Sequence, residues 1–366
     1  MSIDVNSPTL SVNIMAENKD YKSDMDHAIF YVRNLLAALG IWPLVKQNSC
    51  QTQHRKRELI LTTLLITTGM LLMAFVMIPI AVFIILKTRS ITGFLKMLGP
   101  IVIYLSTFSK YCLYIYRRNS IKLCFEHVEI DWKMALTAFD REIMRKKAVL
   151  GRRVCALSMI FIYTTSLLYV TLLPISRGRK ARALNQSGRI LPYNVYDLYL
   201  NPRATPQYQT LFLLSFLSGC VMYTVRVASC CLVAIFVSHA CGQIEIIISR
   251  LDTLFDNLDD DIELLNTRVS FIVRNHVRVL RLISAIEAAF KEIFLTKVIS
   301  STLIICMLGW RLTQWKTSDN VAKTTYLIAL ISLMLNLFLF CYSSELLIER
   351  CAMVGRATYL SDWWKM

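Results

Sequence analysis

The residue types that most often carry out catalysis or bind metals are thinly spread along this chain. None of its five histidines belongs to an HExxH motif or to a Cys/His pair with the spacing of a zinc site. The two glycines closest in sequence are Gly93 and Gly99, and their spacing excludes a GxGxxG motif, a GxSxG motif and a P-loop. The sequence therefore predicts neither an enzyme nor a bound metal or cofactor.

Basic residues inside apolar stretches are the side chains that most need a chemical explanation. Arg226 lies near the middle of the apolar run 211–237, and a central Arg costs about 2.5–3.5 kcal/mol on membrane-insertion scales. Two interpretations stay open: Arg226 faces a water-filled cleft or the interior of a helical bundle, or it snorkels to the cytoplasmic headgroups. Lys110 and Lys297 lie closer to the inner ends of their runs, which favours snorkelling for both.

The elements that position these residues are membrane spans. The 366-residue chain is 55% hydrophobic and only 18% charged, whereas a soluble domain carries about 25% charged residues. About 20 apolar residues are needed to cross a bilayer. Six runs approach or exceed this length: 59–86, 94–116, 154–175, 211–237, 293–312 and 324–343. The predicted fold class is all-α, a polytopic membrane helical bundle with six visible spans.

The distribution of Lys and Arg orients the bundle. Of the 41 basic residues, 25 lie in four segments: 1–58, 117–153, 238–290 and 344–366. In membrane proteins the cytoplasmic segments are the ones enriched in Lys and Arg. The N-terminus is therefore predicted to be cytoplasmic and, with six spans, the C-terminal segment also. Because the basic residues alternate with spans, the net charge of +16 does not indicate nucleic acid as a partner.

One segment on the predicted outer side does not follow this rule. Residues 176–209 are rich in Lys and Arg, which argues against an outer position. The sequon at Asn185 lies in the same segment, and glycosylation occurs only on the lumenal side. We therefore keep this segment outside, with Asn185 as a possible glycosylation site.

The predicted cytoplasmic segments read as helices rather than linkers. Residues 122–150 lack Gly and Pro and mix apolar with charged positions, and 238–290 is similar apart from the acidic cluster at 259–261. The tail contains an amphipathic stretch at 27–45 that ends at a Gly and a Pro. The predicted division is a tail over 1–58, a membrane bundle over 59–343, and cytoplasmic helices over 117–153, 238–290 and 344–366.

The outer halves of the spans carry aromatic, sulfur-containing and hydroxyl side chains. Apolar walls with a few hydroxyl groups suit a small, neutral, hydrophobic ligand. The alternative is ordinary bundle packing with Tyr at the membrane interface. The candidate ligand-binding residues are Tyr104, Phe108, Tyr163, Ser166, Phe216, Met222 and Tyr326.

Two other classes of membrane protein fit less well. The triplet Asp140-Arg141-Glu142 is similar to the Asp-Arg-Tyr triplet of G-protein-coupled receptors, but it lies far from any span end and an NPxxY motif is absent. We interpret it as a solvated helix face. A transporter would show Gly/Pro interruptions at corresponding places in two halves, and the sequence has none.

The C-terminal half resembles the insect odorant receptor family over residues 271–310 and 338–364. Weaker similarity lies at Gly40-Ile41-Trp42-Pro43 and Leu191-Pro192-Tyr193, so that the resemblance covers about 27–364. The match in the last block is carried by Cys341, the run Ser343-Ser344-Glu345, and the spacing of Tyr359 and Trp363.

This resemblance implies an odour-sensing subunit with a cytoplasmic N-terminus, in the membrane of sensory neurons. It implies a hetero-tetramer with a family co-receptor, gated as a non-selective cation channel by small hydrophobic odorants among the outer halves of spans two to six. The cytoplasmic helices would form an anchor between subunits, with Cys341, Glu345, Tyr359 and Trp363 taking part. A gustatory-type receptor of the same superfamily is the alternative.

The sequence departs from the family pattern at its end. Family members have a seventh span, which lines the pore and follows the short helix that corresponds to Trp363-Trp364. The sequence stops at Met366. We expect an incomplete gene model or a splice product rather than a complete subunit, with a non-conducting truncated product as the alternative.

Overall fold

The fold is described from a computed structural model. It describes residues 18, 20–46, 52–87, 91–135, 137–172, 175–176, 178, 205–256, 262–313 and 320–361. The elements are α1 (Tyr21–Ala38), α2 (Trp42–Val45), α3 (Thr52–Lys87), α4 (Ile91–Tyr116), α5 (Arg118–Met134), α6 (Ala138–Leu167), the π-helical turn η1 (Leu168–Leu172), α8 (Thr205–Asp252), α9 (Ile262–Thr313) and α10 (Asn320–Leu360). Every element within these residues is helical, which confirms the predicted all-α class.

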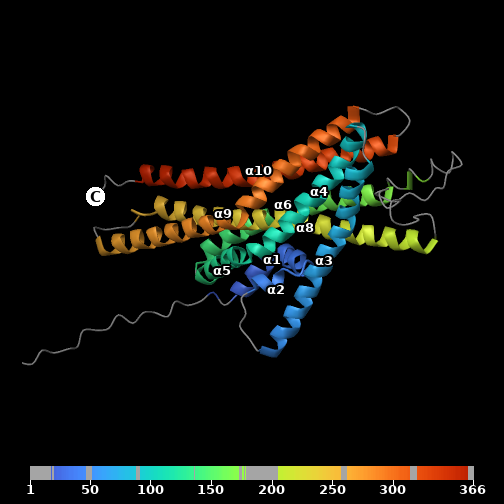
Figure 1. Ribbon diagram of the computed structural model, residues 1–366. Coiled ribbons are helices and arrows are strands. Elements are labelled where there is room, and N and C mark those ends of the chain that lie inside the picture. Colours follow the sequence, from blue (N-terminus) through green and yellow to red (C-terminus); the bar gives the residue numbers. More distant parts are fainter. Residues whose placement is uncertain are drawn as a thin grey trace, which may run out of the picture.

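Six helices are long and apolar enough to cross a membrane: α3, α4, α6, α8, α9 and α10. This agrees with the six predicted spans. Helices α8, α9 and α10 have 48, 52 and 41 residues, which corresponds to about 60–80 Å at 1.5 Å per residue. They are roughly twice as long as the hydrocarbon core is thick, and Figure 1 shows their ends projecting together to one side. The division into bundle and cytoplasmic region stays a prediction.

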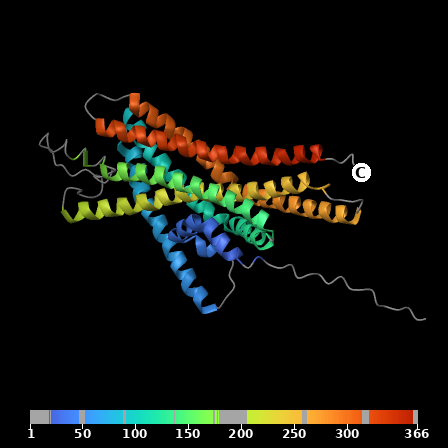
Figure 2. The ribbon, with the colours of Figure 1, turned by 180° about the vertical axis from the view of Figure 1, so that it is seen from behind.

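Helix α8 forms the centre of the bundle. In its most apolar stretch 72% of the residues are buried, against 22–33% in the other five candidate spans. It packs against α3, α6, α9 and α10, and the view from behind in Figure 2 shows α6 lying alongside it. A Cβ atom on Gly151 of α6 would lie 3.0 Å from the Ser238 hydroxyl of α8, so the two helices approach closely there.

Helix α1 is amphipathic and lies against the bundle near α5 and α6. Its buried face is apolar and consists of Ala28, Ile29, Val32, Leu35 and Leu36. The helix ends through Gly40, whose φ of 72° lies in the left-handed region that favours glycine. The amide of Gly40 donates to the Ala37 carbonyl at 3.0 Å, and the amide of Ile41 donates to the Leu36 carbonyl at 2.8 Å. The predicted amphipathic stretch 27–45 is therefore two helices separated by this turn.

Replacing Gly40 with alanine is expected to destabilise the protein by about 1–3 kcal/mol. Alanine disfavours a positive φ, and its Cβ atom would lie 2.9 Å from the Leu65 Cβ and 3.1 Å from the Thr62 carbonyl oxygen. The measurement is the thermal midpoint of the purified protein in detergent. Gly355→Ala is the matched control, because no atom lies within 4 Å of its added Cβ. Equal midpoints for the two variants would contradict the prediction.

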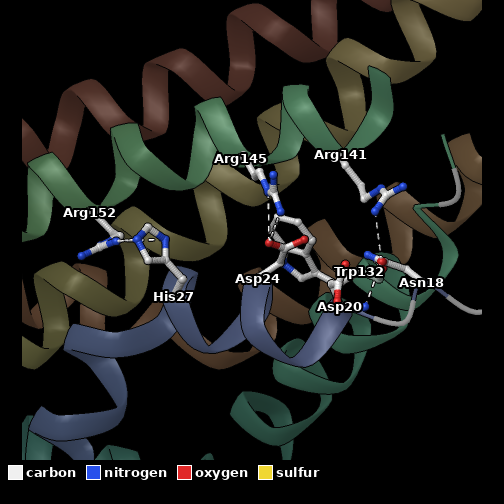
Figure 3. A network of polar contacts seen from close by, with 8 residues as sticks. All are labelled: Asn18, Asp20, Asp24, His27, Trp132, Arg141, Arg145 and Arg152. Carbon is white, nitrogen blue, oxygen red and sulfur yellow. Dashed lines mark hydrogen bonds and ion pairs between the residues drawn. The ribbon is translucent and has the colours of Figure 1, made fainter. Parts of the chain in front are cut away.

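The polar face of α1 is fastened to α6 by arginine side chains, as Figure 3 shows. Arg145 donates from Nε and Nη2 to Oδ1 of Asp24 at 3.0 and 2.7 Å. One turn further along α1, Nη1 of Arg152 lies 2.9 Å from Nδ1 of His27. Asn18, just before α1, accepts from Arg141 and donates to the Trp132 carbonyl oxygen, both at 3.4 Å. The tail helix is thus held by α6 and by the end of α5.

The triplet at 140–142 is not the solvated helix face that we predicted. Asp140 is buried, and both of its carboxylate oxygens accept from Nη2 of Arg250 in α8, at 3.1 and 2.9 Å. Its backbone amide donates to the Thr137 hydroxyl, which caps the first turn of α6. Glu142 alone has the expected setting, in an exposed pair with Lys146 at 2.8 Å. The pairing partner of Asp140 is 110 residues away, so local sequence did not reveal it.

A second ionic cluster joins three helices below the predicted membrane region. Asp131 of α5 lies 2.8 Å from Nε2 of His239 in α8 and 2.8 Å from Nη2 of Arg278 in α9. The side chains of Asp131 and His239 are 3% and 7% exposed, so this cluster is shielded from water. It connects α5, α8 and α9 through one carboxylate.

Candidate ligand site

A cavity of about 120 Å³ lies among α4, α6, η1, α8, α9 and α10. It is near the starts of α4 and α10 and the end of α9, the end of the bundle that the Lys and Arg count places outside. Most of its wall is apolar, and the side chains that form this part include Leu95, Ile103, Met307, Leu308 and Leu333. An engineered apolar cavity of about 150 Å³ binds benzene, so this one has room for a ligand of roughly that size.

Local features of two helices form the space. Gly99 and Pro100 of α4 line it, and a Cβ atom on Gly99 would meet nothing within 4 Å. On the α6 side, the helix widens into the π-helical turn η1, which places Tyr169 in the wall; such turns are frequent at functional sites. Ser332 of α10 donates to the Phe161 carbonyl of α6 at 3.0 Å and holds these two walls together.

The polar part of the wall consists of hydroxyl groups and two arginines. The hydroxyls belong to Thr165, Tyr169, Tyr223 and Tyr326, and the arginines are Arg226 and Arg311. The Thr165 hydroxyl donates to the Phe161 carbonyl of its own helix at 2.8 Å. The guanidinium of Arg311 lies 5.8 Å from the centre of the Tyr326 ring, a cation–π distance.

The seven predicted ligand residues are divided between the cavity and other places. Met222 and Tyr326 line it, whereas Ser166 is not among the lining residues, although its neighbour Thr165 is. Tyr104 is buried beside Met222 in a neighbouring apolar cluster, and Phe108 packs on the main core. Tyr163 and Phe216 are 37% and 38% exposed at the bundle surface. The prediction missed several lining residues, including Tyr169, Tyr223 and Arg311. The Gly99-Pro100 pair in α4 was the one signal in the sequence that could have indicated a cavity at this level of the bundle.

The three basic residues of the spans are inside the bundle. Lys110 and Lys297 are each 2% exposed, so the predicted snorkelling of these two lysines is wrong. Lys297 donates from Nζ to Oδ1 of Asn336, whose Nδ2 donates to the Cys230 sulfur at 3.3 Å. A hydrogen-bonding partner in the bundle interior thus replaces the headgroups. Arg226 lines the cavity, which favours the interpretation that it faces a cleft over the interpretation that it snorkels to the headgroups.

The predicted anchor residues lie on the projecting part of α10 or beyond the described chain. Cys341, Glu345 and Tyr359 are exposed, with Tyr359 at 78%. Trp363 falls outside the described residues, as do the possible glycosylation site Asn185, the acidic cluster 259–261 and the stretch 191–193. The roles of all these residues stay predictions.

Six long apolar helices, five of which surround a small, mostly apolar cavity, define a multi-pass membrane protein. A family model described as 7tm Odorant receptor matches residues 90–366, most of the chain. This chain therefore belongs to the odorant receptor family, a family of receptors and not of enzymes. The expected family is confirmed.

Curated relatives share parts of the sequence. Odorant receptor 13a of Drosophila melanogaster is 22% identical over 185 residues, which is 50% of this chain and 44% of that receptor. Odorant receptor 67a of the same species is 32% identical over 96 residues, 26% of this chain and 23% of the relative. The chain thus matches less than half of the length of each relative.

Solved structures share the fold over nearly the whole chain. The insect olfactory receptor OR5 from Machilis hrabei superimposes with a TM-score of 0.75 at 17% identity, over 93% of this chain and 85% of that one. The same receptor in complex with eugenol gives a TM-score of 0.77 at 16% identity, over 93% and 85% of the two chains. At this identity the likeness shows the fold.

Proposed function

We propose that this protein is the odour-sensing subunit of a ligand-gated, non-selective cation channel in the membrane of sensory neurons. It binds a small hydrophobic odorant and works with the family co-receptor in a hetero-tetramer. It acts through binding and gating, without catalysis. The observation that carries the proposal is the cavity of about 120 Å³ among five apolar helices, in a fold shared with a receptor that was solved with eugenol.

The position of the cavity supports a link between binding and gating. Its walls come from α4, α6, α8, α9 and α10, and three of these helices continue without a break into the projecting region. A ligand that fits between them favours the helix arrangement in which the cavity is open to it. Met222 and Tyr326 are the predicted ligand residues that this proposal keeps in direct contact.

Filling the cavity tests the proposal. Ala329 of α10 lines it, and Ala329→Phe adds one aromatic ring to a space that holds a molecule of about that size. Cells that express the otherwise wild-type chain with a seventh span supplied after residue 366, together with the co-receptor, are expected to give odour-evoked currents to members of a broad panel. Ala329→Phe is expected to abolish these currents while the protein still reaches the cell surface.

Ile331→Phe is the matched control, two positions along the same helix and 49% exposed. It adds an aromatic ring outside the cavity and is expected to keep the currents within about twofold of wild type, as for surface substitutions. A silent wild-type chain across the panel, or full currents from Ala329→Phe, would overturn the proposed function of the cavity.

We also propose a role for the projecting ends of α8, α9 and α10 as the anchor between subunits. The resemblance to the family suggests this role, and Cys341, Glu345 and Tyr359 are exposed on α10, where a partner subunit could contact them. The predicted anchor residue Trp363 belongs to the same proposal by sequence alone.

A further inference from the structure

Arg226 brings an uncompensated positive charge to the cavity wall. Within the part of the chain that the structure describes, neither a hydrogen bond nor an ion pair joins its guanidinium to another side chain, and its Nε atom is buried without a partner. The residue as a whole is partly exposed, where it lines the cavity, and a charge that is largely removed from water in this way is costly unless something pairs with it.

The surroundings of Arg226 strengthen the positive potential. Lys297 is buried nearby, with its Nζ atom 4.0 Å from the sulfur of Cys230, one turn along α8 from Arg226. Arg311 contributes a second guanidinium to the wall. No Asp or Glu is among the described residues that line the cavity. Because most of the rest of the wall is apolar, the field of Arg226 is weakly screened inside the cavity.

We propose that the ligand selected by this cavity is an organic anion: a carboxylate on a short hydrophobic body, with the carboxylate on Arg226. This rests on the proposed function and specifies its ligand class. Guanidinium and carboxylate match as a planar, bidentate pair. The apolar walls formed by side chains such as Ile103 and Leu333 take the hydrophobic body, and the volume limits that body to a few carbon atoms.

A neutral ligand is disfavoured by the same geometry. Filling the cavity with an apolar molecule would exclude water from Arg226 and leave the charge with no partner. Sites with a buried polar group reject analogues that cannot pair with it, by large factors. The proposal differs from the sequence-based expectation of a neutral ligand, which considered the aromatic and hydroxyl side chains but left the position of Arg226 open.

The test compares two probes of the same size and different charge, pentanoate and 2-hexanone. Binding to the purified full chain in lipid nanodiscs is measured by isothermal titration calorimetry. The wild type is expected to bind pentanoate at least about tenfold more tightly than 2-hexanone. Arg226→Gln is expected to lose at least about tenfold in pentanoate affinity and to keep its affinity for 2-hexanone.

Two further variants make the result specific. Arg118→Gln removes the same charge from an exposed position at the start of α5 and is expected to leave both affinities unchanged. Arg226→Lys keeps the charge but not the bidentate geometry and is expected to retain a weaker preference for pentanoate. If Arg226→Gln binds neither probe, the result for Arg226→Lys decides. A preference of Arg226→Lys for pentanoate over 2-hexanone supports the proposal, and the loss of that preference overturns it.

The outcomes separate the ligand class from the function. Equal or tighter wild-type binding of 2-hexanone would overturn the anion proposal and leave an odorant-binding cavity in place. Binding of neither probe, together with silence across the odorant panel, would overturn both. A pentanoate affinity that Arg226→Gln does not reduce would show that the anion binds elsewhere and would also overturn the proposal.

Discussion

Asp131→Ala is expected to destabilise the protein by about 3–5 kcal/mol, the cost of breaking a buried ion pair from one side. The substitution removes the carboxylate that lies 2.8 Å from both His239 and Arg278. Arg278, with a side chain only 21% exposed, would then be a poorly solvated charge without its counterion. This loss is a large share of the free energy of unfolding of a typical protein, which is about 5–15 kcal/mol.

The measurement is the thermal midpoint of the purified protein, with surface expression as a second readout. Glu129→Ala is the matched control two positions earlier in α5. It removes a carboxylate paired with Lys133 at 2.9 Å in a half-buried setting, where such pairs contribute about 0–1 kcal/mol. Asp131→Asn, which keeps the shape and an acceptor oxygen, is expected to fall between them. An Asp131→Ala midpoint equal to that of Glu129→Ala would show that the cluster contributes no stability.

Asn336→Leu is expected to destabilise the bundle by about 2–4 kcal/mol. It deletes the side-chain oxygen that accepts from Lys297 and the amide that donates to Cys230. Leaving a buried charged donor unsatisfied costs more than the 1–3 kcal/mol of a neutral group. The Nζ atom of Lys297 would keep only the Cys230 sulfur, at 4.0 Å, and the Phe340 ring, at 6.0 Å.

The double variant Asn336→Leu with Lys297→Met separates this effect from a simple packing defect. Replacing both partners by apolar side chains of similar size leaves nothing unsatisfied, so most of the lost stability is expected to return. The measurement is again the thermal midpoint, compared among the two single variants and the double variant. A double variant less stable than Asn336→Leu alone would contradict the prediction.

The spans were predictable because hydropathy and charge are local properties of the sequence. The run 293–312 identifies a span without any knowledge of its neighbours, and its helix α9 extends the run on the predicted cytoplasmic side back to Ile262. The end of the amphipathic helix near Gly40 was likewise visible, because only glycine readily adopts the conformation found there.

The cavity was not predictable in the same way, because it depends on which face of each helix meets which neighbour. Tyr163 and Tyr326 look equivalent in sequence, yet the first is exposed and bonds to Thr224 at 3.2 Å, whereas the second lines the cavity. Arg311 lies at the end of an apolar run, and nothing in the local sequence indicated that it would line the cavity. The partners of Lys297 and Asp140, on other helices, were equally hidden.

The pairing of Lys297 with Asn336 has a consequence for how the protein is made. A ribosome delivers α9 to the membrane before α10, so the lysine enters the bilayer ahead of the amide that accepts its hydrogen bond. During that interval α9 bears the cost of placing a cation in a membrane span without its hydrogen-bonding partner. Synthesis of α10 removes this cost. Stable insertion of α9 therefore depends on the arrival of α10. We expect the two helices to insert together as a hairpin, because the lysine then has its partner from the start.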